Sequence, residues 1–305
     1  MEERVSAREI LNRTNEIFVR RPGQILTPAL TAGFLSYWMG WGYSWLQHQL
    51  VFALWRHAHG NVNSAVQRVL IPGLALRFLS VAVTFLLWAA GFAAISQMVI
   101  SFRHGEGISP SRAYGRLVSQ PGWGSLLWGL CWRLVIPGFL LMTLVAGPVG
   151  YWILTWMHIA AGTPTRRFES EILSLLLFGT PYLLYVRRFT LAVPLPIVAG
   201  DAPIDPLRAS AQTSRRWRAV IIGACLVVLG LSNLGDAHLS AMLMAPGFIR
   251  PTVIASYAVW IFVSLATSLL WAWLFVFLTE IAIAEGGGEE VEPPASPSPA
   301  LALNS

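Results

Sequence analysis

The chain has 305 residues, of which 55% are hydrophobic and only 12% are charged, and its mean hydropathy is +0.59. This number of charged residues is too small to cover the surface of a soluble protein of this length. The composition therefore favours an integral membrane protein. The formal net charge is +6, and all 21 basic residues are arginines. Cys131 and Cys225 both lie in hydrophobic stretches, which argues against a disulfide framework or a thiolate metal site.

The first 20 residues are rich in charges, and we expect no secretory signal there because they contain no apolar core followed by a cleavage site. After them, six stretches reach the length of about 20 apolar residues that a membrane-spanning helix needs. These predicted spans lie near residues 25–46, 70–100, 123–146, 171–198, 217–235 and 252–279. The sequence therefore predicts an all-α, polytopic membrane fold.

The end of the third span has two readings, because apolar sequence continues to Ala161. Gly147 and Pro148 favour an end at that point, since proline lacks the backbone donor that would continue a helix. Residues 147–161, which contain several aromatic side chains, would then lie at the membrane interface. The alternative is that residues 147–161 cross the membrane.

A short motif, Ile-x-Pro-x-Arg-Ala, occurs at residues 108–113 and again at 204–209, and residues 5–10 look like a looser copy. Each clear copy predicts a short amphipathic helix with Ser109 or Asp205 as the N-cap and proline in the first turn. Arginines alternate with apolar residues in these segments, so we expect them to lie along the inner membrane interface, near anionic headgroups.

The repeat predicts three units, each an interfacial helix followed by a hairpin of two spans. The units form a single membrane domain over residues 1–284. Their approximate ranges are 1–102, 103–202 and 203–284. Residues 285–305 are acidic and then rich in proline and serine, which is typical of a disordered tail.

The distribution of arginine predicts the orientation. Twelve arginines fall in the N-terminal segment and in the loops after spans two and four, and five fall in the opposite loops. The positive-inside rule then places both termini in the cytoplasm, and we expect the protein in the inner membrane of a bacterium.

Two predicted spans carry small residues at four-residue spacing, which lets helices approach closely in lipid. These residues are Ala32, Ser36 and Gly40 in the first span and Ser264, Ser268 and Ala272 in the last.

Four short motifs carry a resemblance to a known family. They are residues 10–14 (ILNRT), 188–194 (RFTLAVP), 206–210 (PLRAS) and 216–218 (RWR). With them, nearly the whole chain resembles the membrane domain attached to some bacterial glycerophosphodiester phosphodiesterases and its stand-alone relatives. The resemblance implies a membrane fold and no activity, because the catalytic barrel of those enzymes has no counterpart here.

Arginines inside or beside the predicted spans are the candidate binding residues. The set is Arg77, Arg133, Arg187 and Arg188 within spans and Arg112 and Arg208 on the interfacial helices. An arginine at the bilayer centre costs about 2.5–3.5 kcal/mol on insertion scales, so a partner or a shallow position is expected. One reading is a cavity for an anionic headgroup or solute. The other is snorkelling to the inner interface, with Asp201 or Asp205 as ion-pair partners for Arg187 and Arg188.

A histidine group near the outer end of the first hairpin is a weak metal-site candidate. It comprises His48, His57 and His59, of which the last two form a His-x-His pair. No acidic or cysteine ligand lies nearby, so a solvated polar loop explains the group better. We therefore expect neither a metal nor a cofactor.

Two classes of function remain. The first is a non-enzymatic membrane protein that binds anionic lipid or a protein partner, which includes a second copy of the chain, and that supports envelope or lipid homeostasis. The alternative is a transporter of small solutes or lipids with an anion-binding arginine site, which the internal repeat favours. A membrane-embedded enzyme ranks third because no catalytic constellation is visible, and nothing in the sequence indicates nucleic-acid binding.

Overall fold

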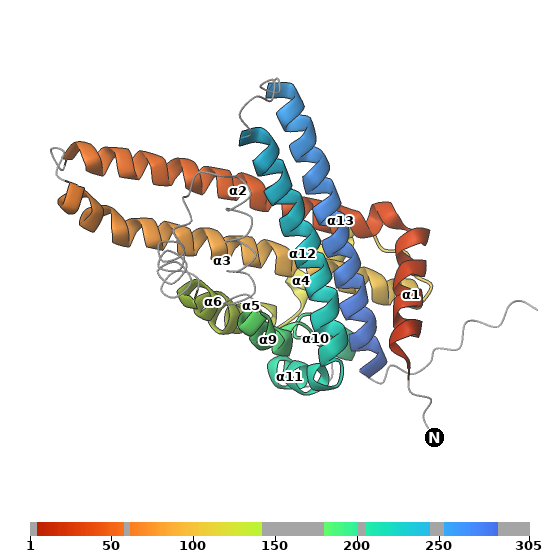
Figure 1. The fold of residues 1–305 in the computed structure, drawn as a ribbon. Coiled ribbons are helices and arrows are strands. Elements are labelled where there is room, and N and C mark those ends of the chain that lie inside the picture. The colour runs from red at the N-terminus through yellow and green to blue at the C-terminus, as the bar shows by residue number, and fades with distance from the viewer. Residues whose placement is uncertain (1–4, 58–61, 142–179, 201–204, 245–252, 286–305) are drawn as a thin grey trace, which may run out of the picture.

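A computed structural model describes residues 5–57, 62–141, 180–200, 205–244 and 253–285. Within these ranges every regular element is a helix, so the predicted all-α class is confirmed there (Figure 1). The elements are α1 (Ala7–Arg20), α2 (Pro22–His57), α3 (Val62–Arg103), α4 (Pro110–Ser119), α5 (Trp123–Leu130), the π-helical turn η1 (Cys131–Val135), α6 (Ile136–Leu140), α9 (Thr180–Val186), the 3₁₀ turn η4 (Arg187–Phe189), α10 (Pro194–Ala199), α11 (Pro206–Arg216), α12 (Arg218–Met244) and α13 (Val253–Glu285). The predicted tail and residues 147–161 lie outside the described ranges.

Three helical stretches in the described part of the chain are long and apolar enough to cross a membrane. They are Pro72–Arg103 in α3, Trp123–Leu140 formed by α5, η1 and α6, and Ile261–Glu285 in α13. The apolar part of α12, Arg218–Ser232, is shorter. The chain therefore has the helices of a membrane protein, while six spans and the repeat of interfacial helix plus hairpin stay predictions.

The long helices form two pairs (Figure 1). α2 packs along α3, and α12 packs along α13, which also contacts α2 and α3. Small residues make the crossings possible: a Cβ atom at Gly91 would lie 3.1 Å from the Cβ of Ala32, and one at Gly33 would lie 2.9 Å from the hydroxyl oxygen of Ser268. The predicted small-residue faces are thus confirmed at Ala32 and Ser268. They do not extend to Gly40, where a Cβ atom would meet no described atom within 4 Å.

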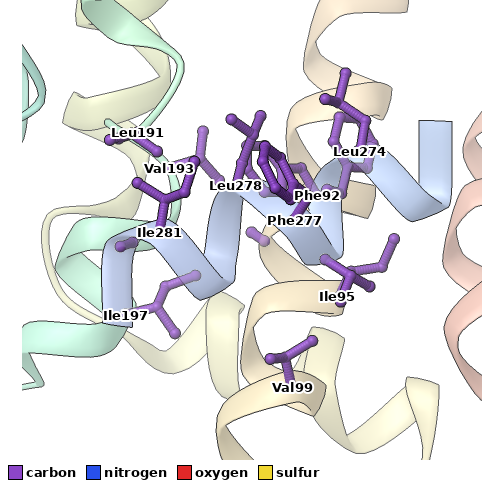
Figure 2. Close-up of a cluster of buried hydrophobic side chains, with 14 of the residues drawn as sticks. Phe92, Ile95, Val99, Leu191, Val193, Ile197, Leu274, Phe277, Leu278 and Ile281 are labelled. Atoms are coloured by element: carbon purple, nitrogen blue, oxygen red, sulfur yellow. The ribbon is translucent and has the colours of Figure 1, made fainter. Parts of the chain in front are cut away.

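The best-packed core lies where α3, α13 and the segment around α10 meet (Figure 2). Phe92 and Ile95 of α3 face Leu278 and Ile281 of α13, and Leu191 extends the same cluster from the segment before α10. All five side chains are buried. Phe92 also stacks on Phe275, with ring centroids 4.4 Å apart. This core fixes the relative positions of helices that are far apart in sequence.

The predicted fourth span, 171–198, is not one continuous helix in its described part. α9 ends at Val186, a 3₁₀ turn covers Arg187–Phe189, and α10 begins only at Pro194. Pro194 and Pro196 explain the break, because neither can donate a helical hydrogen bond and each restricts the residue before it. The broken segment is buried against α3 and α13, which local sequence does not indicate.

Three short amphipathic helices begin with the same kind of cap. Ser6 accepts a hydrogen bond from the backbone N–H of Glu9 at the start of α1. Ser109 accepts from the N–H of Arg112 in α4, where proline is the first helical residue. Asp205 accepts from two backbone N–H groups in the first turn of α11, which also begins with proline. The caps predicted at Ser109 and Asp205 are therefore confirmed.

Candidate functional site

The site begins with a defect in the helix formed by α5, η1 and α6. Pro137 has no N–H to donate to the carbonyl oxygen of Arg133, one turn earlier, and the chain adopts a π-helical turn at this point. The hydroxyl of Tyr185 donates to that carbonyl at 2.7 Å. A backbone acceptor in an apolar helix is thereby satisfied by a side chain of α9, and α9 is held beside η1.

A second contact attaches α11 to the turn after α9. The hydroxyl of Ser210, which is fully buried, donates to the carbonyl of Arg188 at 2.8 Å and accepts from the N–H of Leu191 at 3.1 Å. One side chain of α11 therefore satisfies two backbone groups that the helix break leaves without helical partners. The position of α11 relative to η4 is fixed as a result.

The start of α11 also contacts α5. A methyl group of Leu207 lies 3.5 Å from the place where a Cβ atom of Gly129 would be, which is ordinary van der Waals contact. This contact places the start of α11 against α5. α5, α9 and α11 consequently meet at one corner of the molecule (Figure 1).

Three arginines lie on η1, η4 and α11 at this corner, and we call them the basic cluster: Arg133, Arg188 and Arg208. All three are exposed. Within the described residues none of them forms an ion pair. Asp205, an expected partner, instead accepts from the backbone N–H groups of Leu207 and Arg208, at 3.1 and 3.3 Å. Asp201, the other expected partner, lies outside the described residues.

Large exposed apolar side chains lie on the same helices as the basic cluster. Trp128 and Trp132 lie on the same helix as Arg133, are 65% and 54% exposed, and contact each other edge to face with centroids 5.8 Å apart. Leu184, on α9, is also exposed. Unpaired guanidinium groups beside exposed tryptophans suit the boundary between lipid headgroups and acyl chains, where aromatic rings and snorkelling arginines are both stable.

The structure does not bring all six candidate arginines together. Arg187 is half-buried in the same turn as Arg188. Arg77 is exposed on α3 beside Phe78, whose ring contacts Phe139 of α6, so Arg77 lies beyond Arg133 toward the far end of that helix. Among the described residues, no hydrogen bond or ion pair links Arg77 to the basic cluster.

Arg112 is also separate from the basic cluster. It is exposed on α4, which packs on α3, and no hydrogen bond or ion pair among the described residues links it to the basic cluster. On the same helix, burial raises the pKa of the Tyr114 hydroxyl. Tyr114 therefore stays neutral at physiological pH, and arginine determines the charge of α4.

A charged residue with a structural partner was missed by sequence reasoning. Glu280 is fully buried on α13 and forms a two-point ion pair with Arg103 at the end of α3. The neighbouring Thr279 hydroxyl lies 2.9 Å from that of Ser96, which adds a second polar link between the same helices. The predicted last span ended at residue 279, but the helix continues to Glu285, so Glu280 lies within its apolar stretch. An acid in such a stretch is the signal that could have identified it.

Arg216 has an acidic partner as well. Its guanidinium donates to Glu285 at 2.6 Å, and the indole N–H of Trp217 donates to the same carboxylate oxygen at 2.7 Å. These contacts attach the end of α11 to the end of α13. Arg216 is thus occupied within the protein, unlike Arg208 on the same helix.

The histidine candidates are not assembled into a metal site in the described part of the chain, where no group of three ligating side chains occurs. His48 is exposed on α2, and His57 is the last residue of that helix. His59 lies outside the described residues.

Comparison of the chain with protein-family models, with curated proteins and with solved structures gives no match. The basic cluster itself must therefore carry any inference about function.

Proposed function

We propose that this chain is a non-enzymatic protein of a bacterial cytoplasmic membrane that binds anionic lipid at the basic cluster. The observation that carries the proposal is the position of three exposed arginines on η1, η4 and α11, which have no ion-pair partner within the described ranges, near exposed tryptophans of α5 and η1. Guanidinium groups pair with phosphate through two parallel hydrogen bonds, and basic sites between membrane helices on the cytoplasmic side bind anionic headgroups. Support of envelope or lipid homeostasis is the role that such binding suggests.

The proposal includes a topology. Six spans in three units of interfacial helix plus hairpin, with both termini cytoplasmic, would place α1, α4 and α11 at the inner face. The three capped amphipathic helices and the excess of arginine on that side support it. Reporter fusions at Arg21 and His104 should then be active in the cytoplasm, and a fusion at His59 should be active outside it. Cytoplasmic activity of the His59 fusion would contradict the topology.

We also propose kinship with the membrane domain associated with glycerophosphodiester phosphodiesterases. Two of the motifs behind that resemblance, residues 188–194 and 206–210, are the two sides of the contact made by Ser210. These short motifs thus coincide with the attachment of α11 to the broken helix, which gives them a structural reason.

The site can be tested at Arg188. Arg188→Lys keeps the charge and loses the planar two-donor geometry, and Arg188→Leu loses both. Thermal stability of the purified protein, with and without phosphatidylglycerol, should show lipid-dependent stabilisation that decreases from wild type to Lys to Leu. Arg20→Leu is the matched control, because Arg20 is equally exposed to solvent and pairs with Glu16 of its own helix at 2.5 Å. Equal stabilisation of all four proteins would leave Arg188 as a snorkelling anchor.

One observation favours the second candidate, a transporter. The break between α9 and α10 leaves non-helical backbone buried in the core beside two membrane-capable helices. Discontinuous helices form the substrate sites of many transporters. Uptake of a labelled anionic solute into vesicles containing the protein, abolished by Arg188→Leu, would support this candidate over lipid binding alone.

A further inference from the structure

The arginines of the basic cluster lie at two depths along α5 and η1. Leu207 contacts α5 at Gly129, so the neighbouring Arg208 belongs to the level of Gly129. Arg133 is four residues further along the same helix and therefore on nearly the same face. At a rise of 1.5 Å per residue, the two levels are about 6 Å apart.

The contacts of α9 set the level of the third arginine. Tyr185 contacts the backbone of Arg133. Arg188 comes three residues after Tyr185, and side chains three residues apart in a tight helical turn lie one above the other. The carbonyl of Arg188 accepts a hydrogen bond from Ser210 of α11, so Arg188 lies near the level of Arg208. Because α9 thus leads from the level of Arg133 back to the level of Gly129, it runs opposite to α5. The backbones of Arg188 and Arg208 thus lie at the level of α11, and that of Arg133 lies about one turn further along the helix.

Two phosphate groups match the charge of three arginines at two levels better than one does. One phosphodiester carries one negative charge and would sit with Arg188 and Arg208, which leaves Arg133 without a partner among apolar side chains. A second phosphate at the deeper level would pair with Arg133 and satisfy it. The exposed Trp128 and Trp132 on the same helix provide an apolar surface for acyl chains, which favours a lipid over a soluble bisphosphate as the source of these phosphates.

We propose that the basic cluster selects a lipid whose headgroup carries two phosphate groups. This rests on the proposed function and specifies the class of lipid. Arg188 and Arg208 bind the first phosphate at the level of the interfacial helix, and Arg133 binds the second one turn deeper. Tyr185 positions Arg133, because its hydroxyl holds the π-helical turn from which that side chain projects.

The test compares two lipids at matched negative charge. The purified full-length protein is titrated in neutral-lipid nanodiscs that contain either cardiolipin, with two phosphates, or phosphatidylglycerol, with one, and thermal stabilisation is measured. Cardiolipin should bind about tenfold more tightly, because a charge-assisted hydrogen bond contributes on the order of a tenfold change in affinity. Arg133→Gln should remove most of this preference, because it should weaken the binding of cardiolipin by a larger factor than the binding of phosphatidylglycerol. Arg188→Gln should weaken the binding of both lipids.

Control variants separate the site from a general loss of folding. Arg133→Lys keeps the charge and should keep a reduced preference, and Tyr185→Phe should reduce the preference while Arg133 is still present. Arg13→Gln, in an arginine paired within α1, should behave as wild type.

Three outcomes overturn the inference. Equal affinity for the two lipids contradicts it while the proposed function stands, and stabilisation by neither lipid contradicts the proposed function as well. Stabilisation by inorganic pyrophosphate and not by cardiolipin would show that the ligand is a soluble bisphosphate.

Discussion

On the α13 side of the molecule arginines have carboxylate partners, whereas the three arginines where α5, α9 and α11 meet have none among the described residues. Glu280 binds Arg103 and Glu285 binds Arg216, both from α13. α1, which packs on α13, neutralises Arg13 and Arg20 with its own acids. The comparison suggests that arginines on the α13 side hold the fold together and that those of the basic cluster are kept available for a ligand.

The difference between paired and unpaired arginines does not come from the local structure of the helices that carry them. α1 and α11 begin with similar caps, and each buries a hydroxyl completely, Thr14 in α1 and Ser210 in α11. Thr14 bonds to the carbonyl of Ile10 in its own helix, but Ser210 bonds to the broken segment after α9. Two helices of the same type thus join the bundle in different ways, and α11 brings Arg208, which has no ion-pair partner among the described residues, to its junction with η4.

The largest expected effect is on the α13 side. Arg103→Gln would leave the buried carboxylate of Glu280 without its partner, and the loss of one member of a buried pair costs about 3 kcal/mol. The lower end of the usual range applies because the side chain of Arg103 is 31% exposed. Denaturation in detergent should show this loss with and without anionic lipid. A loss that anionic lipid restores would break the comparison, since Arg103 would then belong with the ligand-binding arginines.

Ser210→Ala should have the next largest effect. It leaves the carbonyl of Arg188 and the N–H of Leu191 without their bonds in a buried place, which costs about 2 kcal/mol. Thr14→Ala is the matched control in α1 and should cost less, because the helix already provides the backbone bonds there. Hydrogen exchange should show faster opening of residues 187–193 in the Ser210 variant. Equal exchange in the two variants would show that α11 is not attached through this hydroxyl.

Removing the helix N-caps should lower the stability of the protein by a smaller amount, which should be similar in α1 and α11. Asp205→Ala and Ser6→Ala each remove an N-cap and should cost about 1 kcal/mol. Only the Asp205 variant should also alter lipid-dependent stabilisation, because a frayed first turn moves Arg208. If the Ser6 variant changes lipid-dependent stabilisation as much, α1 contributes to the lipid site and the comparison fails.

The exposed ion pairs of α1 should matter least. Glu9→Gln breaks a pair between residues four apart on a helix surface, and such pairs stabilise by about 0.3–0.5 kcal/mol. Thermal unfolding at low and high salt measures the contribution of this ion pair, because added salt should remove most of the stability difference between variant and wild type. A difference that persists at high salt would indicate that Glu9 has a further role.

The sequence was sufficient for features that depend on neighbours in the chain. The caps at Ser109 and Asp205 and the break beside Pro194 follow from local chemistry, and the helices fall close to the predicted apolar stretches. Contacts across the fold were not predictable in this way. The bond from Tyr185 to Arg133 joins residues 52 apart, and that from Arg103 to Glu280 joins residues 177 apart. Nothing in the local pattern shows that Arg103 has an ion-pair partner while Arg133 has none among the described residues. The sequence could therefore identify candidate arginines but could not separate those with a carboxylate partner from those without one.

The most direct test of the central claim is to find where anionic lipid lies on the protein. A lipid with two phosphates and a photoreactive headgroup can be crosslinked to the full-length protein in nanodiscs, and the adducts can be assigned to peptides by mass spectrometry. Adducts should concentrate on α5–α6, on residues 183–189 and on α11, and they should be lost when Arg133, Arg188 and Arg208 are all changed to Gln. Adducts that are concentrated on α1 and α13, or that persist in the triple variant, would contradict the account.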